Sequence, residues 1–311
     1  MRVTANSYSN ALIDQLNNLA QRQNQLQSQA ASGQRVQSLS DDPGAARRVL
    51  DLQAEASNVT QFQSNIAALQ DTANASYAAI KSLKTVSDRA GEIATSADGL
   101  DSTQDLANYA NEVTQLIKQA VQAANSQQNG SYLFAGTRSN QPPFVMTTDA
   151  NGRVTSVTYQ GNESVASSQI AEGTTANAQV IGANTSGSGQ RGLITDTASG
   201  ADFFNHLISL QNNLAAGNTD AIANTDRAQL STDEDNLLYH ISNNGAVQSR
   251  LEATASILSD RATAIDSQVS KAADADIAQT LVRFNATQNA YQAALQTGAK
   301  MLNLTLLDYL Q

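Results

Sequence analysis

The most regular pattern in the chain lies in its last forty residues, where mostly apolar positions recur in alternating steps of four and three. These positions are Ile277, Leu281, Phe284, Gln288, Tyr291, Leu295, Gly298 and Leu302. This step is the period of an amphipathic α-helix that packs against a partner along its length. A helix over residues 270–307 would be roughly 57 Å long, too long to pack alone on a small domain. The pattern therefore predicts a long terminal helix that needs a partner.

A matching stripe lies near the start of the chain. Its positions are Leu12, Leu16, Leu19, Gln23, Leu26 and Ala30. The residues between them are mostly Gln, Asn, Ser and Ala, so an isolated helix with this thin apolar stripe would be marginal. We therefore predict that the two termini pair, and that they assemble through an apolar seam. The predicted seam residues are Leu12, Leu16, Leu19, Leu26, Ile277, Leu281, Phe284, Tyr291, Leu295 and Leu302.

Helical periodicity also fills most of the remaining chain. A helix is expected over residues 43–93, because Asp42 is a good N-cap and a proline follows it. Residues 102–124 predict an antiparallel return helix, so the two would form a hairpin. Helical spacing resumes over 202–269, with an expected pause at residues 243–245, where the sequence is Asn-Asn-Gly.

Residues 131–200 differ from the rest of the chain, because they contain short β-prone runs separated by turns. The pair Asn151-Gly152 lies between two such runs and predicts a β-hairpin. Low hydrophobic density leaves a disordered segment as the alternative. The predicted fold class is mainly α: a long antiparallel helical bundle or coiled coil, made of paired N- and C-terminal regions, with a small β-rich inserted domain.

Three domains follow from this layout. We predict a terminal coiled-coil assembly region from residues 1–42 and 270–311. A helical bundle domain is expected from 43–130 and 201–269, and the β-rich insert from 131–200. A generic alanine-rich helical bundle is the alternative that assigns no function to the seam.

Composition excludes several classes of partner. The chain has no Cys and no Trp, only 5% aromatic and 15% charged residues, and a formal net charge of −10. The acidic balance argues against nucleic-acid binding, which needs a basic patch. No apolar stretch approaches the ~18 residues needed to span a bilayer, so we expect no membrane insertion. The absence of cysteine fits an exported protein without disulfides, although a cytosolic protein can also lack them.

The sequence offers few candidates for chemistry. Asp41-Asp42 and the pair Asp274 and Asp276 are the tempting carboxylates, but we interpret them as helix caps and as favourable charges near helix starts. His206 and His240 lack the spacing of metal ligands, and we expect each at the surface or its boundary. No nucleophile elbow, P-loop or dinucleotide-binding pattern is present. We therefore predict a protein that is not an enzyme and that has no cofactor or metal.

Both ends of the chain resemble bacterial flagellins and their relatives. In the N-terminal region the resemblance rests on Ser32–Val36, Ser40–Pro43, Gln61–Ile66 and Ala124–Asn125. In the C-terminal region it rests on Arg250–Glu252, Asp274–Ala278 and Leu304–Leu310. Within this family the resemblance is closer to the hook-associated proteins of the hook–filament junction. The residues that carry this closer match are Tyr132–Gly136, Pro143–Phe144 and Tyr159–Asn162.

The resemblance implies a secreted structural protein, exported by the flagellum's own type III apparatus and located at the hook–filament junction. It also implies its partners: further copies of itself, hook-associated protein 1, flagellin and an export chaperone. The alternative within the family is a minor flagellin of the filament. A type III translocator or tip protein is a different class with a similar helical habit, but it should carry long apolar membrane segments, which this sequence lacks.

Overall fold

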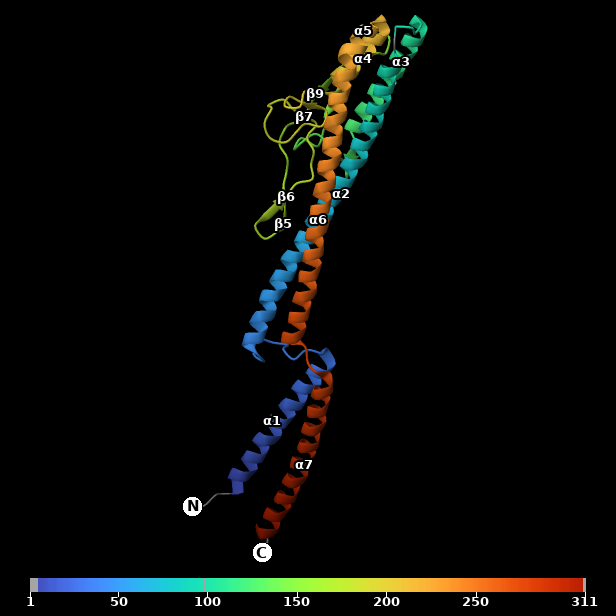
Figure 1. Ribbon diagram of the computed structural model, residues 1–311. Helices are drawn as coiled ribbons and strands as arrows, with labels where there is room; N and C mark the ends of the chain where they lie inside the picture. The colour runs from blue at the N-terminus through green and yellow to red at the C-terminus, as the bar shows by residue number, and fades with distance from the viewer. Residues whose placement is uncertain (1–4, 98, 310–311) are drawn as a thin grey trace. The chain divides into compact units, whose positions relative to one another are not determined.

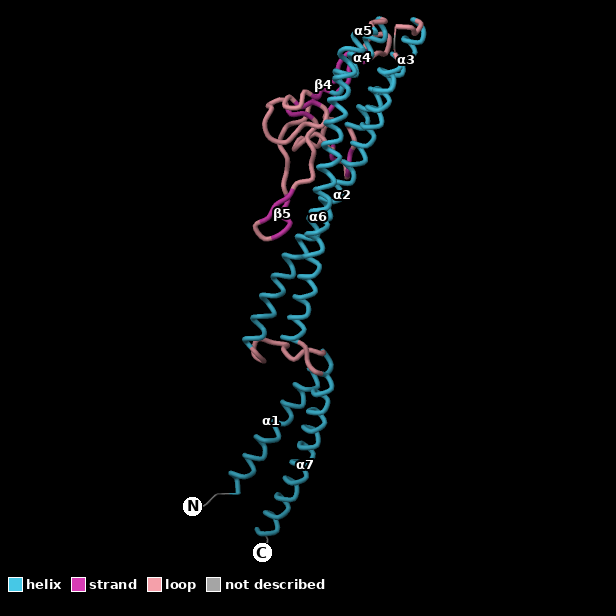
Figure 2. Tube along the Cα trace, viewed as in Figure 1, coloured by secondary structure: helices cyan, strands magenta, loops and turns pink. Residues whose placement is uncertain are grey.

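The computed structural model describes residues 5–97 and 99–309, and long helices dominate it (Figure 1). The helices are α1 (Ala5–Ser32), α2 (Pro43–Ser96), α3 (Thr103–Ala124), α4 (Phe203–Ala216), α5 (Thr219–Ala221), the π-helix η1 (Ile222–Asp226), α6 (Arg227–Ala273) and α7 (Ile277–Tyr309). The strands are β1 (Gln127–Gln128), β2 (Ser131–Tyr132), β3 (Phe144–Thr148), β4 (Val154–Tyr159), β5 (Ser168–Ala171), β6 (Thr174–Ala176), β7 (Ala183–Asn184), β8 (Thr195–Asp196) and β9 (Ala201–Asp202). The strands are short and lie between α3 and α4 in the chain (Figure 2). The predicted fold class is confirmed.

The chain forms two compact units. Unit 1 consists of Met1–Val59 and Asp260–Gln311, and unit 2 consists of Thr60–Ser259. Unit 1 contains α1, α7 and the adjoining ends of α2 and α6. Unit 2 contains the remainder of α2 and α6 together with α3, α4, η1 and all the strands. The three-domain division drawn from the sequence stays a prediction.

Two helix starts are capped as the sequence predicts, and the structure adds a capped helix end at Gly217. Asp42 Oδ1 accepts a hydrogen bond from the backbone N–H of Ala45 at 3.0 Å at the start of α2. Ser102 Oγ accepts from the backbone N–H of Asp105 at 3.2 Å and starts α3. At the end of α4, Gly217 adopts a left-handed conformation with φ 69°. Glycine reaches this conformation without steric cost, and it separates α4 from α5.

The predicted pause at residues 243–245 is wrong, because α6 continues through them without a break. Asn244 is only 3% exposed, and its Nδ2 donates a hydrogen bond to the backbone oxygen of Ala73 at 3.0 Å. Asn is a poor helix former, but a buried amide with a tertiary partner stabilises it in the helix. The contact with α2 therefore overrides the local propensity.

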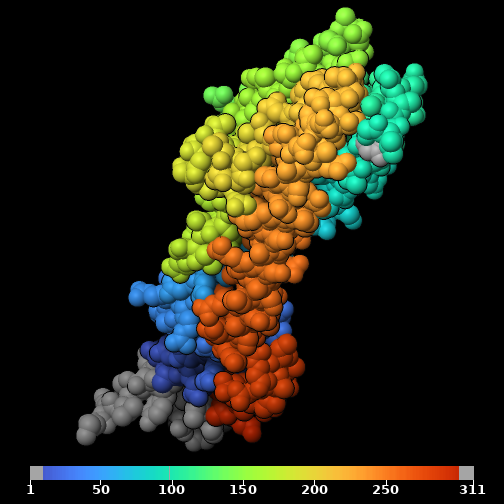
Figure 3. Space-filling model, turned by 45° about the horizontal axis from the view of Figure 1, so that its top comes forward, coloured from blue at the N-terminus to red at the C-terminus, as the bar shows by residue number. Residues whose placement is uncertain are grey.

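The β-rich segment is ordered and shares one hydrophobic core with the helices of unit 2. Buried residues of the segment in this core include Leu133, Phe134, Phe144, Val154, Val180, Leu193 and Ile194. They pack with buried residues of α2, α3, α4 and α6; for example, the rings of Phe144 and Phe204 lie 5.4 Å apart. Figure 3 shows the yellow part of the segment packed directly on the orange α6. The segment is therefore part of the packing of unit 2, and the alternative of disorder does not hold.

The predicted hairpin is present, but its loop is longer than two residues. β3 and β4 pair antiparallel, with Phe144 opposite Tyr159. Residues 149–153 connect them, and Asp149 Oδ1 accepts hydrogen bonds from the backbone N–H groups of Asn151 and Arg153. The aspartate thus closes a wider turn that contains the Asn-Gly pair. β1–β2 and β5–β6 are also antiparallel pairs, and β7, β8 and β9 form a three-stranded sheet in which β7 and β8 are parallel.

Candidate assembly surface

Within unit 1, α1 and α7 pack side by side (Figure 1). On α1, Leu26 is buried, whereas Leu12, Leu16 and Leu19 are half-buried. The two helices approach closely where Gly298 of α7 faces Leu12 of α1. A Cβ atom added to Gly298 would lie only 2.6 Å from Cδ2 of Leu12. The four predicted α1 residues therefore all lie toward the partner helix or beside it.

The face of α7 that is buried against α1 is not the one with the largest apolar residues. It is lined by Thr280 and Thr287, which are 7% and 8% exposed, and by buried Gly298. Phe284 and Tyr291 flank this face and are half-buried. Small residues allow two helices to approach closely, so this pairing depends on shape more than on apolar area.

Three further predicted residues of α7 lie on the adjoining face, where about half of each side chain is exposed. Ile277, Leu281 and Leu295 are 51%, 46% and 46% exposed, and we call these three residues the outer stripe. They share one side of the helix, since Leu281 follows Ile277 by about one turn and Leu295 follows it by about five turns. The predicted seam residues of α7 therefore lie on two adjoining faces, one paired with α1 and one about half exposed. The side chain of Leu302 lies outside the described residues.

The surroundings of the outer stripe are nearly free of charge. Between Ile277 and Lys300, the only charged residues are Arg283 and Lys300 itself. The exposed positions beside the stripe are mostly Ala, Gln, Asn and Thr. Identical surfaces of this kind can be brought together without like-charge repulsion, which would otherwise oppose packing of equivalent helices.

A network of backbone hydrogen bonds joins two connecting segments, the one between α1 and α2 and the one between α6 and α7. We call this network the joint; it is made by residues 33–36 and 272–275. The backbone N–H of Ala275 donates to the oxygen of Gly33 at 2.8 Å, and that of Arg35 donates to Ala273 at 2.6 Å. The guanidinium of Arg35 adds a bond to the oxygen of Ala272 at 2.8 Å. The joint therefore fixes the start of α7 to the end of α1.

The candidate carboxylates are part of this framework. Asp41 accepts from the backbone N–H groups of Gln37 and Ser38, and these bonds lower the pKa of its carboxyl below the ordinary value. The pKa of Asp42 is also lowered, first by its bond from Ala45 and then by Arg35. Asp276 Oδ1 accepts from the backbone N–H of Gln279 at the start of α7. Asp274 accepts from the hydroxyl of Ser270. Caps and local hydrogen bonds account for these groups.

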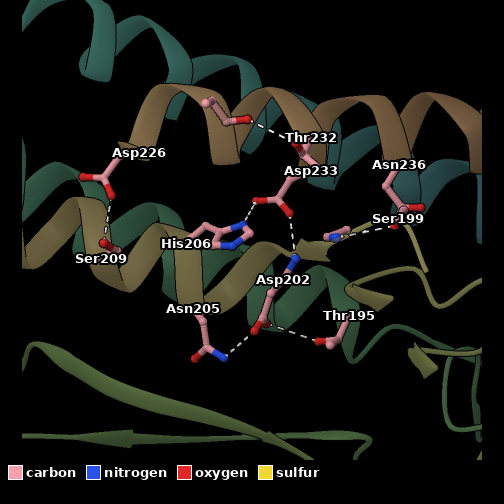
Figure 4. Close-up of polar contacts among 12 residues, drawn as sticks. Thr195, Ser199, Asp202, Asn205, His206, Ser209, Asp226, Thr232, Asp233 and Asn236 are labelled. Atoms are coloured by element: carbon pink, nitrogen blue, oxygen red, sulfur yellow. Dashed lines mark hydrogen bonds and ion pairs between the residues drawn. The ribbon is translucent and has the colours of Figure 1, made fainter. Parts of the chain in front are cut away.

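One of the two histidines differs from expectation. His240 is 1% exposed rather than at the surface, and its Nε2 lies 3.1 Å from the backbone oxygen of Gly192. Burial lowers the pKa of His240 to about 4, so this imidazole is neutral at physiological pH. His206 is at the boundary, with its Nδ1 2.8 Å from Oδ2 of Asp233 (Figure 4). Among the residues that the structure describes, no three His, Asp or Glu side chains are grouped to hold a metal ion.

Over residues 5–97 and 99–309, no helix is both long enough and apolar enough to cross a bilayer.

The fold defines a class: a mainly α protein with paired terminal helices and a small β-rich segment between its central helices. Two protein-family models match the sequence. The bacterial flagellin N-terminal helical region matches residues 3–139, and the bacterial flagellin C-terminal helical region matches residues 222–310. Together they span well over half of the chain. The chain therefore belongs to the bacterial flagellin family, as predicted.

Among the solved structures with the same fold are flagellar hook-associated proteins and a protein named FlgL. A flagellar hook-associated protein from Vibrio parahaemolyticus aligns with a TM-score of 0.64 and 22% identity, over 75% of this chain and 100% of that one. Flagellar hook-associated protein 3 from Legionella pneumophila aligns with a TM-score of 0.59 and 16% identity, over 71% and 97%. FlgL from Bacillus cereus aligns with a TM-score of 0.56 and 19% identity, over 71% and 99%. No curated protein sequence matches the chain.

Proposed function

We propose that the chain is a structural component of the bacterial flagellum that joins the hook to the filament. It assembles with further copies of itself through its terminal helices, contacts hook-associated protein 1 on the hook side and receives flagellin on the other. The observation that carries this proposal is the outer stripe of α7, which the chain leaves uncovered although it is apolar and nearly uncharged.

The energetics favour burial of this stripe in an assembly. Full burial of a Leu or Ile side chain contributes about 1.5–3 kcal/mol. Roughly half of each of the three side chains is still exposed, so covering them contributes about 2–4 kcal/mol per subunit. A tubular stack places the same contact between every pair of neighbours, and the contributions repeat around the axis.

The similar structures support the junction over other flagellar positions. Those reported above are hook-associated proteins, and they align over nearly their whole length. The same comparison supports a structural role rather than catalysis. Secretion through the flagellar export apparatus, with an export chaperone, belongs to this proposal because a junction protein must reach the outer end of the hook.

A deletion strain tests the function directly. Complete hooks without filaments, with flagellin released into the medium, are the expected phenotype of a lost junction protein. Restoration by the wild-type chain on a plasmid is the matched control.

The alternative is a minor flagellin, which the two matched family descriptions also allow. In that case the deletion strain keeps filaments that are shortened or altered in shape. Filaments of this kind would overturn the assignment to the junction while leaving the family unchanged.

A further inference from the structure

A polar stripe on α4 faces the segment formed by η1 and the start of α6 in unit 2 (Figure 4). The stripe consists of His206, Ser209 and Asn213, whose spacing of three and four residues places them on one side of the helix. The apolar side of α4 carries Phe203, Phe204, Leu207, Leu210 and Leu214, all of them buried in the core. Polar residues at three successive turns of a largely buried helix require partners on the facing segment.

Two buried carboxylates are those partners. Asp233 is 1% exposed; its Oδ2 lies 2.8 Å from Nδ1 of His206, and its Oδ1 accepts from the backbone N–H of Asp202 at 2.9 Å. Asp226 is fully buried and accepts from Ser209 Oγ at 2.8 Å and from Asn213 Nδ2 at 2.7 Å. We call His206, Ser209, Asn213, Asp226 and Asp233 the polar seam.

Asp226 lies in η1, a single π-helical turn. Such turns are rare, and where they occur they are often found at functional sites. The π turn directly precedes the start of α6, the helix that carries Asp233. The local departure from α-helical geometry therefore coincides with the polar seam.

The charges of the polar seam are unbalanced. No lysine or arginine forms an ion pair with Asp226 or Asp233 in the part of the chain that the structure describes. Arg227 is next in sequence, but its guanidinium donates to the backbone oxygens of Ala94 and Thr95 at the end of α2. A buried carboxylate is costly without a counter-charge, and only the imidazole of His206 can supply one here.

The charged groups around His206 are all acidic. Asp233 acts from α6, Asp202 from β9 and Asp226 from η1. Burial by itself lowers the pKa of His206, but the hydrogen bond to Asp233 and these three charges outweigh it, so the pKa of His206 is raised. Burial raises the pKa of Asp233 as well. Both shifts mean that the folded seam holds a proton more tightly than the separate groups do.

We propose that the polar seam is a proton-binding site, and that protonation of His206 ties α4 to α6 and so couples the stability of unit 2 to pH. The protonated imidazole forms an ion pair with Asp233, whose other oxygen holds the chain at Asp202. Loss of this proton leaves the two buried carboxylates with hydrogen bonds but without a cation.

The sign of the effect follows from linkage. The folded state holds the proton at a higher pH than the unfolded chain, in which histidine titrates near about 6.5. The stabilisation is therefore fully present below about pH 6.5 and is lost as pH rises through the higher pKa of the folded state. Within this window, the unfolding equilibrium constant rises up to about tenfold for each pH unit, which corresponds to one proton.

Denaturant unfolding of the full chain between pH 6 and 9 tests the coupling. We expect the wild-type unfolding constant to rise with pH as described. His206→Asn retains a donor near the position of Nδ1 but cannot be protonated, so its pH dependence should be smaller by one proton. His240→Gln is the matched control, compared above about pH 7.5, where His240 is neutral in the folded state and in the unfolded chain and so adds no pH dependence of its own. An equal pH dependence in the wild type and in His206→Asn would overturn the proposal.

A second measurement does not depend on a variant. The chain has only two histidines, so the imidazole resonances of the folded wild type can be followed by NMR and assigned by comparison with His240→Gln. His206 should titrate above pH 6.5, and His240 should stay neutral throughout this range. Titration of His206 at or below the ordinary histidine value would contradict the proposal, whatever the unfolding data show.

Discussion

The α1–α7 pair of unit 1 and the core of unit 2 are both helical, yet they are held together by different kinds of residue. In unit 2, large side chains such as Phe134, Phe203 and Leu83 are almost completely buried. In the α1–α7 pair, the inner face of α7 is made of Thr280, Thr287 and a glycine, while Ile277, Leu281 and Leu295 are 46–51% exposed. Unit 2 thus buries its large apolar side chains internally, whereas the pair leaves several of its own partly exposed.

The two regions therefore differ in the source of their stability. Unit 2 has the buried area that an independent domain needs. The pair consists of long helices with a thin interface, and such helices depend on neighbours. We infer that the pair reaches its full stability only in an assembly, and the predictions below test this contrast from the largest expected effect to the smallest.

The first prediction tests whether unit 2 depends on its buried core. Phe134 is fully buried, and its backbone oxygen accepts from Tyr159 Oη at 3.0 Å and from the N–H of Gly182 at 2.9 Å. Phe134→Ala should destabilise unit 2 by about 3–5 kcal/mol, because it leaves a cavity in the core. The melting temperature should fall by more than about 6 °C in calorimetry.

Val145→Ala is the control for this change, because Val145 lies in β3 but is 47% exposed. Its effect should stay within about 0.5 kcal/mol. If Phe134→Ala melted like the wild type, the β-rich segment would be dispensable to the core, and the contrast between the two regions would lose its basis.

The second prediction concerns the outer stripe. Leu295→Asp places a carboxylate on an exposed position of the soluble chain, where it stays hydrated, so melting and secretion should match the wild type. In the assembly the same carboxylate would be buried without a partner, at a cost of several kcal/mol. Cells should therefore lose filaments and release flagellin into the medium, as seen by electron microscopy and immunoblotting.

Ala286→Asp is the matched control. Ala286 is exposed and lies nine residues from Leu295, about two and a half turns, which places it on the opposite side of α7. We expect this variant to retain more filaments than Leu295→Asp. Normal motility in Leu295→Asp cells would remove the outer stripe from the proposed mechanism.

The sequence reveals the long helices, because their apolar period persists over many turns. It does not reveal which part of a stripe meets which partner. The alternating step of four and three marks a wide band of the helix surface. This band includes both Phe284, which is half-buried beside α1, and Leu295, which is more exposed. The sequence does not mark Thr280 and Thr287 as interface residues, since threonine carries no apolar signal and only the position of α1 identifies them.

Distant contacts explain the other differences between prediction and structure. His240 is buried because its acceptor, the oxygen of Gly192, comes from a loop 48 residues away in the chain. Asn244 stays helical because of a bond to Ala73, which belongs to another helix. The core residues of the β-rich segment are sparse in the sequence but gather in space. No local pattern encodes these contacts, so a single sequence could not have supplied them.

The third prediction tests how closely α1 and α7 must approach. Gly298→Val adds a branched side chain where even a Cβ atom would lie 2.6 Å from Leu12 Cδ2. The overpacking should cost about 1–3 kcal/mol at this end of the pair. Hydrogen exchange should become faster in the amides of α1 around Leu12, while unit 2 keeps its protection.

Ala299→Val is the control for Gly298→Val, because residue 299 is exposed and the substitution introduces the same β-branched side chain. Equal exchange rates around Leu12 in the two variants would mean that helix propensity, and not the close approach, determines the result.

The smallest expected effect lies at the joint. Arg35 binds Oδ2 of Asp42 at 3.1 Å and the backbone oxygen of Ala272 at 2.8 Å through two different guanidinium nitrogens. Lysine has a single ammonium group and cannot reproduce this planar, two-sided contact. Because the ion pair is 47% and 39% exposed, its loss should cost no more than about 1 kcal/mol. Arg35→Lys should therefore leave the melting of both units unchanged and act only on local opening.

Hydrogen exchange of the Ala275 amide, which donates to Gly33 across the joint, measures that opening. A cost of 1 kcal/mol corresponds to about fivefold faster exchange there, provided that the joint closes faster than the open amide exchanges. Arg47→Lys is the control, since Arg47 is exposed near the start of α2 and makes no contact with residues 272–275 among the hydrogen bonds of the described chain. Unchanged exchange at Ala275 in Arg35→Lys would show that the backbone hydrogen bonds hold the joint alone. Faster exchange would instead place Arg35 among the groups that fix the start of α7, and thereby the direction in which the outer stripe faces its neighbours.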